Sequence, residues 1–290
     1  MPAKIIDGKY HSKQILSETK EAVARLVNTG GRPPCLAVVL VGDDPASAIY
    51  VGSKKKTCEE VGIKSREHIM PGNTSPEALF ALIDELNKDD GVDGILVQSP
   101  LPSHMDEGAV FRAIDPAKDV DGFHPVNAGL LTMGEGRLVP CTPAGVIELL
   151  RREGVKIQGA KSVVIGRSNI VGKPAAMLML KENATVTICH SRTSSEDLIK
   201  ICGDADIIIA AVGRKFFLEP HMVKEGAVII DVGINRTPGT KKIFGDVDPA
   251  CMDKAAAMTP VPGGVGPMTV AMLMKNCLDA YQARKELNPK

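Results

Sequence analysis

The sequence predicts an α/β protein of two α/β domains around a cleft, the second built on a doubly wound parallel sheet. The chain has 290 residues, enough for about two domains of ~100 to 200 residues each. Short β-branched runs alternate with helical patterns, which is typical of parallel sheets crossed by helices. An irregular stretch rich in glycine and proline, 120–141, indicates a connection between the domains.

Two apolar runs in the first half, 36–41 and 94–97, predict buried strands, because short β-branched segments between turn residues are typical of parallel sheets. Helical spacing recurs around these strands near 12–28, 46–61, 75–88 and 106–113. We therefore expect a first α/β domain over residues 1–140.

A helix is expected directly after the irregular stretch. Thr142 can cap it, Pro143 suits its first position, and Gly154 can end it behind two arginines. The strands that follow are expected at 162–165, 185–189, 206–211 and 227–232, with room for a crossover helix between them. This alternation predicts a Rossmann-like domain over residues 141–267, after which a long helix over 268–290 would complete the first domain.

The equal numbers of acidic and basic residues argue against nucleic acid or a membrane as the partner. Lys plus Arg and Asp plus Glu number 35 each, so no net field attracts nucleic acid or an anionic membrane. With no Trp and 3% aromatic residues, the chain also lacks the stacking platforms of single-strand binders. We find no signal peptide and no apolar run of membrane-spanning length, about 18 residues. A small molecule is the expected partner.

The seven cysteines are spread along the chain without C-x-x-C pairs, which indicates reduced thiols in a cytoplasmic protein. Five histidines likewise show no metal-ligand spacing, and exposed or helix-capping positions are expected for His11, His68, His104, His124 and His221. The sequence predicts no metal site.

The stretch 166–174 joins a predicted strand to a predicted helix, as the phosphate-binding turn of a dinucleotide site does. Its glycines miss the usual G-x-G-x-x-G spacing, because Ser168 stands in the second position and Gly172 comes one residue late. Ser168 adds a hydroxyl and Arg167 adds a cation, so side chains as well as backbone amides could hold phosphate. An ordinary glycine-bearing turn between strand and helix is the alternative.

The next predicted strand ends in the polar segment 190–193, at a point where NAD sites carry an acidic residue that accepts the ribose hydroxyls. A carboxylate there would repel a 2′-phosphate, whereas Ser191 and Arg192 could bind one. The sequence therefore predicts NADP rather than NAD as the cofactor. A solvated polar loop is the alternative.

In the first half, Tyr50 and Lys54 lie four residues apart, on one face of a predicted helix. Lys55 and Lys56 point elsewhere. A functional pair is one interpretation, and a solvated lysine-rich face is the other.

Taken together with three further stretches, these segments make the chain similar to the bifunctional methylenetetrahydrofolate dehydrogenase/cyclohydrolase family over nearly its whole length. The five stretches occur in order, at 50–54, 97–102, 118–122, 166–174 and 262–269. One departure concerns the pocket lining: position 99 is Ser99 where the family more often has Leu.

The resemblance implies an enzyme that oxidises 5,10-methylenetetrahydrofolate with NADP to the 5,10-methenyl cation and hydrolyses that cation to 10-formyltetrahydrofolate in one pocket. It also implies a homodimer through the nucleotide-binding domain. A dehydrogenase without hydrolysis, a nucleotide-sensing regulator and a scaffold assembled by its C-terminal helix are the alternatives.

The resemblance further implies residue roles. Lys54 would carry protons, once partial burial and a cationic substrate lower its pKa, and Gln98 would orient it. Tyr50 would border the folate rings, and Asp121 would accept hydrogen bonds from the amino-pyrimidine edge. Further folate contacts would come from Val97, Ser99, Pro262, Gly263 and Gly264. Cofactor contacts would come from Gly166, Arg167, Ser168, Ile170, Ser191, Arg192 and Ile234.

Three of these residues or segments also have a simpler structural interpretation. Asp121 could serve only as a turn former, because Asp is frequent in such turns. The segment 262–267 could be only a connector, and Ile234 could belong to the core.

Overall fold

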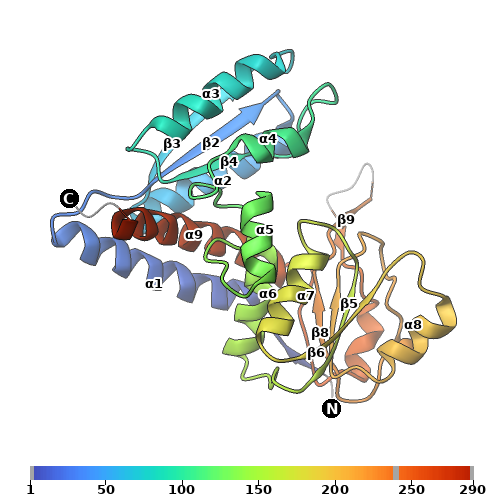
Figure 1. Ribbon diagram of the computed structural model, residues 1–290. Coiled ribbons are helices and arrows are strands. Elements are labelled where there is room, and N and C mark those ends of the chain that lie inside the picture. The colour runs from blue at the N-terminus through green and yellow to red at the C-terminus, as the bar shows by residue number, and fades with distance from the viewer. Residues whose placement is uncertain (1–2, 238–241, 288–290) are drawn as a thin grey trace. The chain divides into compact units, whose positions relative to one another are not determined.

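The computed structural model describes residues 3–237 and 242–287 (Figure 1). The chain divides into two compact units. Unit 1 comprises Met1–Lys13 and Thr142–Thr269, and unit 2 comprises Gln14–Cys141 and Val270–Lys290. The polypeptide therefore passes from one unit to the other three times.

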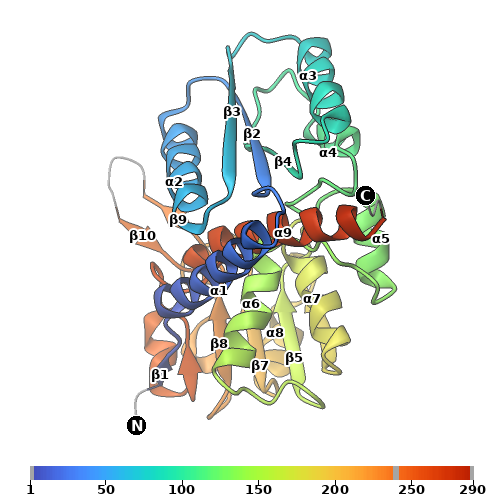
Figure 2. The ribbon, with the colours of Figure 1, turned by 90° about the vertical axis from the view of Figure 1, so that its left-hand side faces the viewer.

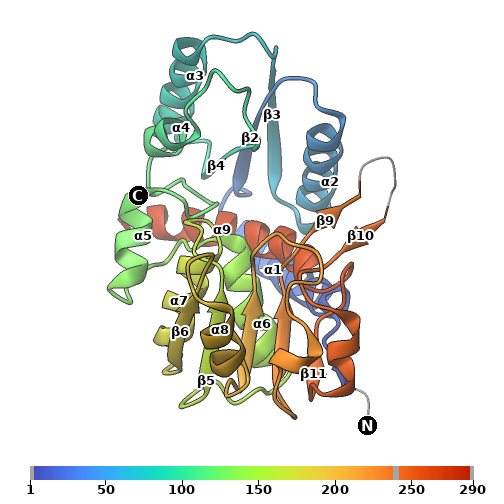
Figure 3. The same ribbon diagram turned by 90° about the vertical axis from the view of Figure 1, so that its right-hand side faces the viewer.

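Unit 2 is built on a parallel sheet in the order β3-β2-β4, formed by β2 (Cys35–Val41), β3 (Lys64–Met70) and β4 (Gly94–Val97). Every residue of β2 is buried, because this central strand is covered on both faces. Figures 2 and 3 show α2 (Pro45–Val61) on one face of the sheet, and α3 (Pro76–Lys88) with α4 (Glu107–Ala113) on the other.

The core of unit 2 follows from the alternation of β2. Cys35, Ala37 and Val39 point to the face where Leu79 and Ile83 of α3 pack against them. Most of α1 (Gly8–Asn28) and of the C-terminal helix α9 (Val265–Leu287) also belongs to unit 2. A helix was predicted over 268–290; residues 288–290 lie outside the described part of the chain, and α9 from Val270 onward falls in unit 2.

Two elements of unit 2 differ from the sequence prediction. Strand β3 was not expected, because its mostly polar residues are exposed or half-buried at the edge of the sheet and give no apolar run. The stretch predicted to be an irregular connection, 120–141, contains α5 (Pro125–Thr132) and lies within unit 2. Helix α5 begins at Pro125, and His124 caps it by accepting the N–H of Val126.

Unit 1 contains a six-stranded sheet in the order β1-β11-β8-β7-β5-β6, with every pair parallel. Its strands are β1 (Lys4–Ile5), β5 (Lys161–Ile165), β6 (Thr185–Cys189), β7 (Ile207–Ala210), β8 (Val228–Asp231) and β11 (Ala257–Met258). The remaining elements are α6 (Cys141–Arg152), α7 (Gly172–Lys181), α8 (Ser195–Cys202), the 3₁₀ turns η1 (Pro220–Met222) and η2 (Pro249–Asp253), and the hairpin of β9 (Asn235–Arg236) and β10 (Ile243–Phe244).

The strand order confirms the predicted doubly wound topology. From β5 the chain moves to β6 on one side and then crosses to β7 on the other side of β5. Helices α7 and α8 accordingly lie on opposite faces of the sheet (Figures 2 and 3). Ligands of such sheets bind outside the carboxyl ends of the strands where the order reverses, which here means after β5 and β7.

The predicted strands of unit 1 agree with the structure to within one residue at each end, but the predicted cap of α6 is wrong. The helix begins at Cys141, so Thr142 lies inside it. Its hydroxyl instead forms a hydrogen bond of 2.9 Å with the hydroxyl of Thr269.

The N-terminal residues also differ from the predicted division, because Met1–Lys13 falls in unit 1. Strand β1 pairs with β11, and two residues are too few for a sequence pattern. His11 was expected to be exposed or capping, and this prediction is wrong. His11 is 5% exposed, and its ring lies 2.6 Å from the Glu153 carboxylate, which also pairs with Lys4.

The described residues also bear on the predictions for cysteines, membrane-spanning segments and metal ligands. All seven cysteines are free and buried. Within residues 3–237 and 242–287, no helix has both the length and the hydropathy to cross a membrane. The same residues contain no group of three His, Cys, Asp or Glu side chains that could hold a metal ion.

Candidate functional site

The first cluster of candidate side chains lies in unit 2, where Lys54 lies on α2 and Gln98 directly follows β4. The Lys54 ammonium donates a hydrogen bond of 2.8 Å to Oε1 of Gln98. The Gln98 amide nitrogen donates to the carbonyl oxygen of Ser99 at 2.6 Å, and its backbone N–H donates to Val39 at 2.8 Å. Because the amide group is bound at both ends, its oxygen is held toward the lysine.

A short segment after the β4 region presents Asp121. Its neighbour Lys118, 1% exposed, donates to three main-chain carbonyls at the end of α3, those of Leu86, Asn87 and Asp89, at 2.8 to 2.9 Å. Asp119 accepts the N–H of His124 at the start of α5. The segment 118–122 is therefore fixed between the end of one helix and the start of another.

The backbone beside Asp121 is fixed from a second side. Gly122 has φ +71°, and a Cβ there would lie 2.5 Å from the carbonyl carbon of Val139. Asn276 of α9 donates to the carbonyls of Val120 and Val139 at 2.8 and 2.9 Å. No donor among the described residues binds the Asp121 carboxylate, so the interpretation of Asp121 as a turn former has no hydrogen bond to support it.

The charges of Lys54 and Asp121 influence each other. Burial lowers the pKa of Lys54 from its ordinary value, and the negative charge of Asp121 partly opposes that shift. Burial raises the pKa of Asp121 to about 6, partly opposed by Lys54. The lowered lysine pKa agrees in direction with the sequence prediction. The pair brings a proton donor and an acceptor with shifted pKa values into one half-buried cluster.

The other folate residues predicted in unit 2 differ in what they expose. Tyr50, one helical turn before Lys54, is 44% exposed, and Ser99 is half-buried. Val97 is 2% exposed and packs in the core, so its side chain is not available to a ligand. The structure brings Lys54, Gln98 and Asp121 together.

In unit 1, the turn 166–172 follows β5, at the reversal of strand order. Gly166 has φ +132°, and a Cβ there would lie 2.2 Å from the carbonyl oxygen of Ala211 after β7. A Cβ at Gly172 would lie 2.3 Å from the carbonyl oxygen of Gly166. Both glycines are therefore required by close backbone approach, and the late glycine is the one that lets α7 pack on the start of the turn.

Ser168 closes this turn. Its hydroxyl oxygen accepts the N–H groups of Val171 and Gly172 at 3.2 and 3.3 Å. A serine hydroxyl has two lone pairs and one hydrogen, so its O–H is left to donate to a bound anion. Arg167 is exposed and Ile170 is 46% exposed, which leaves both side chains accessible to a ligand.

The segment after β6 is a closed polar turn. The N–H of Thr193 donates to the His190 carbonyl at 2.8 Å, and the N–H of His190 donates to the Thr193 hydroxyl at 3.0 Å. Ser191 and Arg192 are exposed. The guanidinium of Arg192 forms no ion pair with the described acidic residues, which leaves it free to bind a phosphate.

Two further predicted segments of unit 1 follow β8 and β11. Ile234 is 54% exposed, so the interpretation that it belongs to the core is wrong. Pro262 is exposed, whereas Gly264 is buried. A Cβ at Gly8 would lie 1.7 Å from the Gly264 oxygen, so this segment packs directly on the start of α1.

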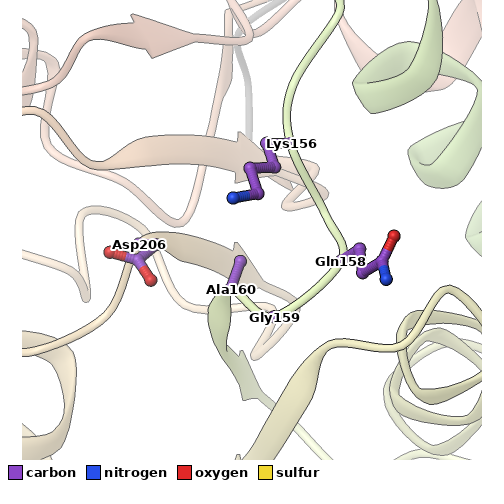
Figure 4. Close-up of a pocket in the computed structure, with 5 residues that line it drawn as sticks. All are labelled: Lys156, Gln158, Gly159, Ala160 and Asp206. Atoms are coloured by element: carbon purple, nitrogen blue, oxygen red, sulfur yellow. The ribbon is translucent and has the colours of Figure 1, made fainter.

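A pocket of about 310 Å³ in unit 1 contains none of the predicted residues (Figure 4). It is lined by Lys156, Gln158, Gly159, Ala160 and Asp206. Ala160 and Asp206 directly precede β5 and β7, so the pocket lies at the amino ends of these strands. The turn 166–172 lies at their carboxyl ends, which is where doubly wound sheets bind nucleotides.

Sequence reasoning missed residues that support the site without belonging to it. The sequence pattern assigns Lys118 and Asp119 no role of their own within the segment 118–122, and it assigns none to Asn276. Asp231 and Asp246, which hold the loops after β7 and β8, were also missed. The signal available for the last two was weak, since each is an aspartate in a short run with glycine.

Two family models match most of the chain. Residues 6–121 match the family model of the tetrahydrofolate dehydrogenase/cyclohydrolase catalytic domain, and residues 140–285 match that of the NAD(P)-binding domain. The chain is 54% identical over 288 residues to "Bifunctional protein FolD" of Acetivibrio thermocellus, covering 99% of this chain and 100% of that protein.

Two solved structures are also similar over nearly the whole chain. The bifunctional methylenetetrahydrofolate dehydrogenase/cyclohydrolase of Campylobacter jejuni has a TM-score of 0.93 at 47% identity, covering 97% of this chain and 99% of that one. The Trypanosoma brucei enzyme, solved with NADP and an inhibitor, has a TM-score of 0.92 at 39% identity, covering 98% and 99%. The chain therefore belongs to the tetrahydrofolate dehydrogenase/cyclohydrolase family.

Proposed function

We propose that this enzyme oxidises 5,10-methylenetetrahydrofolate to 5,10-methenyltetrahydrofolate with NADP, and hydrolyses the product to 10-formyltetrahydrofolate. The observation that carries the proposal is the Lys54–Gln98 hydrogen bond beside Asp121, in the unit matched by the family's catalytic domain. Lys54, Gln98 and Asp121 lie in the range of the catalytic-domain model, and the proposed cofactor residues lie in the range of the NAD(P)-binding model.

The residues of unit 1 fit NADP. The turn 166–172 has no room for side chains at its two glycines and offers a free serine O–H, as a phosphate requires. Arg192 and Ser191 would hold the 2′-phosphate, and Arg167, Ile170 and Ile234 would border the rest of the cofactor. When bound, NADP supplies the acceptor for the hydride that leaves the folate methylene carbon.

For the oxidation, the main task of the protein is to position the substrate. Lone pairs on the two folate nitrogens drive the hydride away, so the protein must hold the methylene carbon in a productive orientation. Asp121 would accept hydrogen bonds from the amino-pyrimidine edge, and Tyr50 would border the rings. Ser99, Pro262 and Gly263 would contribute the remaining folate contacts, with Val97 and Gly264 contributing through their main chains.

Hydrolysis needs proton transfer as well. Water adds its oxygen to the methenyl carbon, the bond from that carbon to N5 breaks, and N5 takes up a proton while the formyl group stays on N10. Lys54 can exchange these protons because burial lowers its pKa, and Gln98 keeps the ammonium in place. A dehydrogenase without hydrolysis would have no use for this pair.

The first test is Lys54→Met. We expect cyclohydrolase turnover to fall by about 10²- to 10⁴-fold, the range for removal of a general acid–base group, while NADP affinity stays unchanged. Both activities can be followed by the absorbance of NADPH and of the methenyl product. Full hydrolysis by this variant would refute the role of Lys54, and absence of turnover in the native protein would favour a nucleotide-sensing regulator.

A homodimer through unit 1 and a cytoplasmic location complete the proposal. Strand β6 is at the edge of its sheet, with Ile188 37% exposed, and Leu180 on the preceding helix is 56% exposed. An edge strand with exposed apolar side chains is a surface that natural proteins usually cover.

The seven free cysteines support a reducing compartment, as the proposed cytoplasmic location requires.

A further inference from the structure

Two buried carboxylates of unit 1 have no part in the proposed chemistry. Asp231 is the last residue of β8, and Asp246 lies two residues beyond β10. They are 3% and 0% exposed, and no cation of the described residues forms an ion pair with either. A carboxylate removed from water this completely requires hydrogen-bond donors in place of solvent.

The donors to Asp246 come mainly from the loop after β7. One carboxylate oxygen accepts the N–H groups of Val212 and Gly213 at 2.7 and 2.9 Å. The other accepts the N–H of Arg214 at 2.9 Å and the side-chain amide of Asn235 at 2.8 Å. Three successive N–H groups converging on one point form an anion-binding nest, and here the carboxylate of the chain itself fills it.

Asp231 supports Asp246 in turn. Its carboxylate accepts the N–H of Asp246 at 2.9 Å, that of Val247 at 3.0 Å and that of Gly233 at 2.9 Å. The end of β8 is thereby bonded to the segment that carries Asp246, and Asp246 is bonded to the loop after β7.

The packing around these carboxylates leaves little room for movement. A Cβ at Gly233 would lie 2.3 Å from a carboxylate oxygen of Asp246, and a Cβ at Gly245 would lie 1.8 Å from one of Asp231. The loops after β7 and β8 therefore keep their positions only while both carboxylates do.

These loops adjoin the proposed cofactor residues. Gly166 packs on the carbonyl of Ala211, the residue before the nest, and Ile234 lies between Gly233 and Asn235. We propose that Asp246, supported by Asp231, is a positioning residue that fixes the loops 211–214 and 233–235 for NADP binding. The proposal depends on the proposed cofactor site. The same contact accounts for the proposed position of the NADP phosphates. Because the negative charge of Asp246 already fills the nest, phosphates are repelled there and would bind at the turn 166–172.

The test is Asp246→Asn, which keeps the size of the side chain but turns an amide donor toward backbone N–H groups. We expect KM for NADP to rise about tenfold or more, since a buried donor set loses its acceptor. The kcat of the cyclohydrolase, measured on methenyltetrahydrofolate without NADP, should stay within about twofold, because Lys54 and Gln98, which would handle the protons, lie in unit 2. A merely structural defect would lower both activities.

Two variants serve as controls. Asp248→Asn removes a nearby carboxylate that only caps η2, and should leave KM for NADP within about twofold. Arg192→Glu, an exposed charge reversal, should raise KM for NADP if the cofactor site is assigned correctly. A raised KM in Arg192→Glu with a normal KM in Asp246→Asn overturns the positioning role alone. Normal values in both overturn the cofactor site itself.

A milder variant covers the case in which Asp246→Asn does not fold. Asn235→Ala removes one donor at the edge of the cluster and should raise KM for NADP about threefold, with normal cyclohydrolase turnover. A normal KM in that variant counts against the proposal.

Discussion

At the scale of single residues, two side chains of unit 2, Lys54 and Asp121, change each other's ionisation. Burial makes the Lys54 ammonium easier to deprotonate and makes the Asp121 carboxyl easier to protonate. The sequence could indicate Lys54, Gln98 and Asp121 through a family resemblance. It also indicated a lowered pKa for Lys54, but not the raised pKa of Asp121, because that shift depends on burial by residues distant in the chain.

The raised pKa of Asp121 leads to a pH prediction. Its carboxyl has a pKa of about 6 instead of 3.8, so the protonated form accumulates as the pH falls through about 6. A protonated carboxyl is a poorer acceptor for the amino-pyrimidine edge, so kcat/KM of the cyclohydrolase should fall on the acid side. We expect Asp121→Asn to have lower activity and to lack this acid limb.

The control for this profile is Asp84→Asn, which changes an exposed carboxylate of α3 paired with Lys88. The acid limb should persist in that variant. An acid limb that persists in Asp121→Asn would show that a group other than Asp121 causes the loss of activity at low pH.

At the scale of elements, the position of Asp121 depends on the end of α3. Lys118 places a buried ammonium against three carbonyls that the helix leaves without intrahelical partners. Burial lowers the pKa of Lys118. Its ammonium group is held in place by hydrogen bonds to three main-chain carbonyl oxygens. This contact could not be predicted from the sequence, because a lysine beside an aspartate is typical of an exposed surface.

We expect Lys118→Met to destabilise the protein by about 3 kcal/mol, because buried carbonyls lose charge-assisted donors. Urea unfolding followed by circular dichroism would measure this. Lys88→Met, which removes an exposed lysine from the last turn of α3, should cost less than about 0.5 kcal/mol. Equal losses in the two variants would contradict the role of Lys118.

At the scale of the whole molecule, the sequence predicted the doubly wound sheet and most strand limits, because apolar β-branched runs at regular spacing follow directly from burial. It did not predict β1, β3 or α5. Two residues give no period, an exposed edge strand gives no apolar run, and α5 is short and lies among glycines. These elements depend on their partners in the fold.

The assembly proposed above can be tested by sedimentation velocity. We expect a dimer for the native enzyme and a monomer for Ile188→Lys, because a charge at the edge of β6 opposes pairing between strands. Ile69→Lys makes the same change on β3, the edge strand of unit 2, at a side chain that is 69% exposed. Dissociation by Ile69→Lys and not by Ile188→Lys would assign the interface to unit 2.

The three passages of the chain between its units have a practical consequence for anyone who wants to study NADP binding in isolation. A gene fragment that encodes only 142–269 would omit β1, which pairs with β11 at one end of the six-stranded sheet. It would also omit Lys4 and His11, the partners of Glu153. A self-sufficient fragment would need its first 13 residues spliced back on, so this enzyme is better dissected by substitution than by truncation.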